Sequence, residues 1–238
     1  MNKDKLPIDV EAVDLLKRVQ ANLASALDSL AGKTTEAEAS YLVWGAAHIN
    51  KTIAGYIVLR EARLLHASKL LVRPVLETTF YACAVLRERG FLLQKAYSEF
   101  LEDAKIAAAN DADRAALKLK AKEEFERLLG LLTVEQPDYP QVESKKVGVE
   151  NAAVAAKLTQ AYQFDFRLYC QFMHGALRAT SGDLDSLTDK RDSPLMIWCA
   201  LIICEELKKH TPAEVSDLAC FWNELRELPD PTSTISNT

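Results

Sequence analysis

Apolar residues recur along this chain at steps of three and four positions, the spacing that places side chains on one face of an α-helix. Within residues 8–31, for example, the step runs through Val13, Leu16, Val19 and Leu23. No segment shows the sustained alternation of apolar and polar residues that is typical of a β-strand. The eight glycines and eight prolines fall mostly at segment ends, where they interrupt helices. The pattern therefore predicts an all-α fold.

Helix boundaries follow from N-cap residues, glycines and prolines. These signals predict a single-domain bundle of about seven to nine helices, over residues 8–31, 35–60, 62–89, 91–132, 150–161, 162–180, 194–209 and 213–228. The stretch 91–132 is either one long helix or two shorter helices broken at Asn110 and Asp111. Two polar segments, 133–148 and 181–193, are predicted to be loops.

The segment 62–89 is apolar on nearly every side, which predicts a helix buried at the centre of the bundle. Its few polar residues are spaced by three and four and form a stripe of their own, made up of His66, Lys69, Arg73 and Glu77. Pro74 has no N–H to donate to the carbonyl of Leu70, so the backbone should kink there unless the helix starts at that point.

Composition agrees with one folded domain, because 49% of the 238 residues are hydrophobic and 26% are charged. We expect an N-terminal extension over 1–7, a helical domain over 8–228 and a disordered tail over 229–238. The formal net charge of −5 provides no global basic field for nucleic acid or anionic lipid. The longest apolar run, at 195–204, is too short to span a membrane, and no secretory signal opens the chain. We therefore expect a cytoplasmic protein.

Common motifs for nucleotide and metal sites are missing from the sequence. The sequence contains no GxGxxG, no GxxxxGK[ST], no HExxH and no CxxC, so we expect neither a bound cofactor nor a metal site. The five cysteines are scattered through apolar segments and are predicted to be reduced thiols. Trp44, Trp198, Trp222 and His48 also lie in apolar stretches, and the pattern predicts that they pack in the core.

One helix face between 162 and 180 carries a polar constellation. Arg167 and His174 are seven positions apart, and at 100° per residue this separation returns to within about 20° of the same face. Gln171 and Arg178 lie on or near the same face at steps of three or four. The face therefore offers two cations, an amide and an imidazole, which is a plausible composition for a binding cleft.

Two interpretations of these polar residues stay open. In one, Glu77 pairs with Arg73 on its own helix or with Arg167 or His174 across a helix interface, and the residues form a structural salt-bridge network in a non-catalytic interaction or sensing protein. In the other, Glu77, Arg167 and His174 meet in a cleft and act on a substrate.

The runs HASKLLVRPVLE (66–77) and YQFDFRLYCQFMHG (162–175) resemble an uncharacterised bacterial helical family, domain-of-unknown-function family 5677. That family in turn looks like the HEPN group (higher eukaryotes and prokaryotes nucleotide-binding), whose signature is an Arg followed after four to six residues by a His. Arg167 and His174 are separated by six residues. A polar residue often follows the Arg in HEPN nucleases, whereas here Leu168 does.

The resemblance implies a metal-independent ribonuclease or RNA-binding protein of a defence or toxin–antitoxin system. It would make His174 the acid/base that activates the ribose 2′-hydroxyl, Arg167 the cation that stabilises the phosphorane, and Glu77 the residue that orients one of them. Arg73, Gln171 and Arg178 would bind the substrate. The implied partners are RNA, a second copy of the chain, and an antitoxin or other product of a neighbouring gene.

Overall fold

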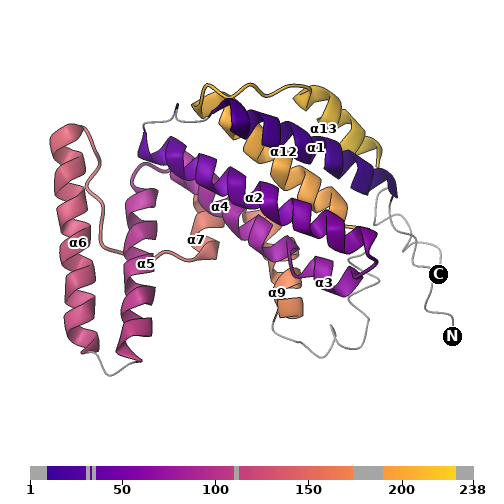
Figure 1. Cartoon of the computed structure of the whole chain (residues 1–238). Helices are drawn as coiled ribbons and strands as arrows, with labels where there is room; N and C mark the ends of the chain where they lie inside the picture. Colours follow the sequence, from indigo (N-terminus) through magenta and orange to yellow (C-terminus); the bar gives the residue numbers. More distant parts are fainter. Residues whose placement is uncertain (1–9, 31–32, 34–35, 110–112, 174–189, 229–238) are drawn as a thin grey trace. The chain divides into compact units, whose positions relative to one another are not determined.

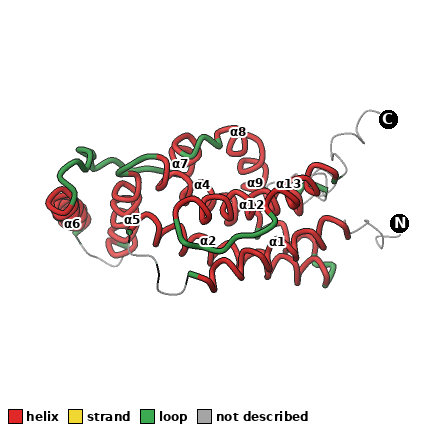
Figure 2. The backbone as a smooth tube through the Cα atoms, turned by 90° about the horizontal axis from the view of Figure 1, so that it is seen from above, coloured by secondary structure: helices red, strands yellow, loops and turns green. Residues whose placement is uncertain are grey.

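The computed structural model describes residues 10–30, 33, 36–109, 113–173 and 190–228 (Figure 1). Within these ranges the chain forms helices joined by turns and loops and contains no strand, so the predicted all-α fold is confirmed (Figure 2). The chain divides into two compact units, one made of Met1–Ala82 with Gln160–Thr238 and the other of Cys83–Thr159. The predicted domain boundaries stay a prediction, and the terminal segments 1–7 and 229–238 lie outside the described residues.

The first unit is built from both ends of the chain. Helices α1 (Val10–Ser29) and α2 (Ala37–Glu61) pack against each other, and both pack against α12 (Asp192–His210). Helix α13 (Leu218–Glu227) lies against α1 and α12 (Figure 1). The inward face of α1 carries the apolar step predicted from the sequence, because Val13, Leu16, Val19 and Leu23 are all buried.

Helix α12 supplies many of the buried apolar side chains of this core. Its buried apolar side chains point to every side of the helix and are Met196, Ile197, Cys199, Ala200, Leu201, Ile202, Ile203, Cys204 and Leu207. A helix that is apolar all round must be covered on all sides, and α1, α2 and α13 provide that cover. None of the described helices combines the length and apolar character that a membrane crossing requires.

The predicted continuous helix over 62–89 is wrong in its first part. The segment forms a short helix, α3 (Leu65–Lys69), and then a longer one, α4 (Val72–Arg87). Pro74 lies in the first turn of α4, where a missing N–H costs nothing because the carbonyl four residues earlier, that of Leu70, lies outside the helix. Helix α4 is buried along most of its length, as predicted. The predicted polar stripe is interrupted, since Lys69 is fully buried on α3 whereas His66 is exposed.

Helix α2 approaches α4 closely at a glycine. A Cβ atom built on Gly45 would lie 3.4 Å from both Thr78 and Ala82 of α4. The opposite face of α2 is open to solvent, and there the prediction for the aromatic residues fails. Trp44 is 58% exposed and stacks on the exposed ring of His48, at 5.9 Å between ring centroids.

The second unit contains a helical hairpin formed by α5 (Phe91–Ala108) and α6 (Arg114–Glu135), followed by α7 (Val149–Ala155). Two helices therefore replace the single long one, which was the second of the two predictions for 91–132. The carboxylate of Asp113 caps α6 by accepting from the N–H groups of Ala115 and Ala116. The rings of Tyr97 and Phe125 meet edge to face between the helices, at 5.4 Å.

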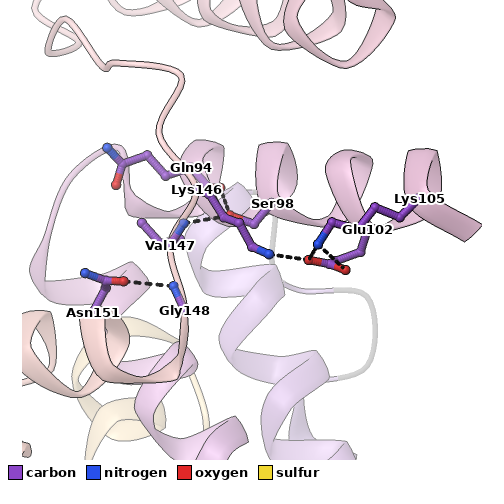
Figure 3. Close-up of polar contacts among 8 residues, drawn as sticks. All are labelled: Gln94, Ser98, Glu102, Lys105, Lys146, Val147, Gly148 and Asn151. Carbon is purple, nitrogen blue, oxygen red and sulfur yellow. Dashed lines mark hydrogen bonds and ion pairs between the residues drawn. The ribbon is translucent and has the colours of Figure 1, made fainter. Parts of the chain in front are cut away.

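The loop between α6 and α7, residues 136–148, is fastened to α5 (Figure 3). The N–H of Val147 donates to Ser98 Oγ at 2.9 Å, and Lys146 forms an ion pair with Glu102. Lys146 and then Lys105 hold the pKa of the exposed Glu102 carboxyl down to about 2. Gly90 precedes α5 with φ at 96°, and a Cβ atom there would lie 2.5 Å from Val142 of the loop.

The predicted helices over 150–161 and 162–180 are divided differently in the structure. After α7, a short turn α8 (Thr159–Ala161) leads into a π-helical segment, η1 (Tyr162–Phe166), and then into α9 (Arg167–Met173). Lys157 separates α7 from α8 with φ at 57°. The remainder of the predicted helix and most of the predicted loop 181–193 lie outside the described residues. Helix α13 begins later than predicted, after Asp217 with φ at 56°.

Candidate functional site

Three of the predicted site residues gather around one thiol. Arg73 and Glu77 come from the first half of α4, and Arg167 opens α9. The charges of all three act on Cys170, one turn further along α9. The structure therefore brings together side chains from two helices that are distant in the sequence.

The pKa of the Cys170 thiol shows how the surrounding charges act at this position. Burial raises the pKa of Cys170, the guanidinium of Arg73 opposes that rise, the carboxylate of Glu77 adds to it, and Arg167 opposes it again. The net shift of the pKa is upward, so Cys170 is a neutral thiol at pH 7. It is accordingly a poor nucleophile and a weak metal ligand.

Among the described residues, the charged side chains around Cys170 do not form ion pairs with one another. Within the described ranges, no ion pair joins Glu77 to Arg73 or to Arg167, although the sequence suggested both pairs. The Nε of Arg73 is buried and has no hydrogen-bond partner among the described residues. The guanidinium of Arg73 lies over the ring of Phe166, at 5.4 Å from its centroid.

The remaining predicted residues are only partly covered by the structure. Gln171 follows Cys170 on α9 and is half-buried, while Arg167 is exposed. His174 and Arg178 lie outside the described residues, so the predicted imidazole and second cation of the stripe have no structural account.

A buried polar cluster near this place was missed from the sequence. Arg60 of α2 and Asp192 of α12 form an ion pair with both side chains essentially inaccessible, at 3.8 Å. The hydroxyl of Tyr169 on α9 donates to Asp192, and Tyr56 shares a hydrogen bond of 3.0 Å with Ser193. Burial, and then the carboxylate of Asp192, raise the pKa of Tyr169 well above its ordinary value.

This buried cluster (Arg60, Asp192, Tyr169, Tyr56 and Ser193) ties α2, α9 and α12 together. A weak signal for it exists in the sequence, because Arg60 interrupts the apolar side of α2 and Asp192 precedes an apolar helix. Neither residue reveals its partner, since the two are separated by most of the chain.

The predicted absence of a metal and of a cofactor stays a prediction. In the part of the chain that the structure describes, no group of three or more His, Cys, Asp and Glu side chains is arranged to hold a metal ion. The donors around Cys170 are two guanidinium groups, one carboxylate and one neutral thiol, a set suited to anions rather than to a cation.

No protein-family model, curated protein or solved structure matches the chain.

Proposed function

We propose that this chain binds RNA at the surface around Cys170 and cleaves it as a metal-independent ribonuclease. The observation that carries the proposal is the convergence of Arg73 and Arg167 on one thiol, with neither guanidinium in an ion pair among the described residues. Uncommitted guanidinium groups bind phosphate oxygens through paired N–H donors. A half-buried arginine beside an exposed one can hold a phosphodiester at the protein surface.

In the proposed reaction, His174 accepts the proton of the ribose 2′-hydroxyl as its oxygen attacks the phosphorus. The bond from phosphorus to the 5′-oxygen then breaks, and that oxygen takes up a proton, which yields a cyclic phosphate and a free 5′-hydroxyl. Arg167 stabilises the additional negative charge on the phosphorane. Arg73, Gln171 and Arg178 bind the flanking phosphates and sugars, and Glu77 orients a neighbouring cation.

Covalent catalysis by the cysteine fits the site less well. The pKa of Cys170 is raised, whereas a nucleophilic cysteine needs a lowered pKa so that the thiolate forms at neutral pH. Replacement of Cys170 by Ser should therefore leave RNA cleavage in place.

The test is cleavage of a broad RNA panel by the purified chain in EDTA. His174→Ala and Arg167→Ala should each lower the rate by about 10²-fold or more, with an unchanged melting temperature. Arg226→Ala, an exposed arginine on α13, is the matched control and should cleave at the wild-type rate. If the wild-type protein leaves every RNA of the panel intact, the proposal of a ribonuclease is overturned. If the wild-type protein also binds none of these RNAs, the proposal of an RNA-binding protein is overturned as well.

The competing proposal is a non-catalytic interaction or sensing protein in which the same polar residues are structural. It predicts that Glu77→Gln and Arg167→Ala each lower the free energy of unfolding by roughly 3–5 kcal/mol, because a buried charge loses its partner. The exposure of Arg167 and the absence of an ion pair to Glu77 in the described residues favour the RNA site.

The setting of the reaction is also proposed. We place the protein in the cytoplasm, as part of a defence or toxin–antitoxin system, with a second copy of the chain and a neighbouring-gene product as its partners. Size-exclusion chromatography with light scattering tests the dimer, and co-expression with the product of the adjacent gene tests whether it suppresses cleavage.

A further inference from the structure

A second site lies in the first unit, at the start of α12. It is a pocket of about 330 Å³, which is within the range of small-molecule sites. Its walls are apolar and come from Pro194, Leu195 and Trp198 of α12 and from Leu225 of α13. The polar part consists of one ion pair, between Asp165 of η1 and Arg191 at the N-terminal end of α12.

The π-helical segment delivers Asp165 to this pocket. A π-helical turn contains an additional residue and has poorer backbone geometry than an α-helix, and such segments are frequent at functional sites. Burial raises the pKa of Asp165 although Arg191 opposes that rise, so the carboxylate is held in the pocket at an energetic cost. The fold tolerates both an irregular helix and a desolvated carboxylate at one position.

The ion pair leaves part of its hydrogen-bonding capacity unused. Arg191 donates through Nη2 to Asp165 Oδ1 at 2.7 Å. Among the described residues no other hydrogen bond engages Arg191 Nη1 and Nε or Asp165 Oδ2. The two side chains are 38% and 16% exposed, so they remain within reach of a ligand. Together they present an acceptor beside a donor, with no net charge.

We propose that this pocket binds an uncharged planar ligand with an amide-like edge, such as an aromatic carboxamide or a nucleobase. The N–H of such an edge donates to Asp165, and its carbonyl or ring nitrogen accepts from Arg191. The ring lies in the apolar part of the pocket, beside Trp198. A neutral ion pair favours neither an anion nor a cation, and this selects against free acids and amines of the same shape.

The test compares three benzene derivatives of similar size that differ in charge, benzamide, benzoate and benzylammonium, by quenching of Trp198 fluorescence. The protein carries Trp44→Phe and Trp222→Phe, so that Trp198 is the remaining tryptophan. The protein with Asp165 and Arg191 unchanged should bind benzamide at least tenfold more tightly than either benzoate or benzylammonium. Asp165→Asn leaves a net cation and should turn the preference to benzoate, and Arg191→Gln leaves a net anion and should turn it to benzylammonium.

Circular dichroism and the melting temperature confirm that each variant is folded. If one of the two charge variants does not fold, the other is sufficient for the test. Binding of none of the probes by the wild type, or an unchanged order of preference in the folded variants, would overturn the proposal. Nicotinamide and cytidine serve as further probes that distinguish an aromatic carboxamide from a nucleobase as the ligand. Tighter binding of cytidine points to a nucleobase. The site is independent of RNA cleavage, which both variants should retain.

Discussion

At the level of single residues, the buried cluster holds two opposite charges out of contact with water. Arg60 and Asp192 are 1% and 0% exposed, and each would be a desolvated charge without the other. A buried ion must be compensated by an opposite charge or by hydrogen bonds, because desolvation costs several kcal/mol. Asp192 has both a cation and the hydroxyl of Tyr169.

We therefore expect Arg60→Met to lower the free energy of unfolding by roughly 3–5 kcal/mol, measured in urea. The double variant Arg60→Met with Asp192→Leu should lose less than the two single variants added together, since neither charge of the pair is then left buried without the other. Lys122→Met is the matched control, because the ion pair of Lys122 with Glu126 is exposed and an exposed pair contributes at most about 1 kcal/mol. An equal loss for Arg60→Met and Lys122→Met would contradict the role of the cluster.

At the level of elements, the loop 136–148 shows how an irregular segment is held without regular structure. Ser98 donates to the carbonyl of Gln94 on its own helix and accepts from the N–H of Val147 (Figure 3). Val147 is 5% exposed, so that its N–H has little access to water. The predicted loop is therefore joined to α5 by a buried hydrogen bond.

Ser98→Ala should lower the free energy of unfolding by about 1–3 kcal/mol, because a buried N–H loses its acceptor. Hydrogen exchange of the Val147 amide should accelerate, and this measurement locates the effect in the loop. Lys146→Met, which removes only an exposed ion pair in the same segment, should leave that exchange rate close to the wild-type value. Equal protection of Val147 in Ser98→Ala would exclude Ser98 as the anchor.

At the level of the whole molecule, titratable groups in the core around α12 make the free energy of unfolding fall at alkaline pH. Burial raises the pKa of Cys204 from 9.0 to about 12 and also raises that of Tyr169. The folded protein holds these protons more tightly than the unfolded chain does. Their contribution is fully present below pH 9 and is lost as the pH rises toward 12.

The free energy of unfolding should therefore fall between pH 8 and pH 11, with roughly 2–3 kcal/mol of the fall due to Cys204. Cys204→Ala removes the titrating group, and the fall should shrink by that amount. Ile203→Val, a neighbouring core change without a titratable group, should show the full wild-type fall. A fall that is identical in Cys204→Ala would show that this thiol does not titrate with unfolding.

Periodicity located the helices well because it records which side of a helix meets the core. It does not rank the two mostly apolar segments, 62–89 and 194–209, and the structure buries both α4 and α12. It also misjudged Trp44, an apolar residue of α2 that points away from the core. Pro74 signalled the break between α3 and α4, since the alternative to a kink was a helix that starts at this point, and α4 begins at Val72.

The sequence by itself determined the all-α class and the approximate positions of several helices, because these depend on neighbours within a few positions. Tertiary structure alone decided the pairings. It placed Arg73 and Glu77 beside Cys170, Arg60 against Asp192, and Asp165 against Arg191. Such pairs join segments far apart in the chain, and their partners are chosen by packing and by the cost of burying a charge, which no local pattern records.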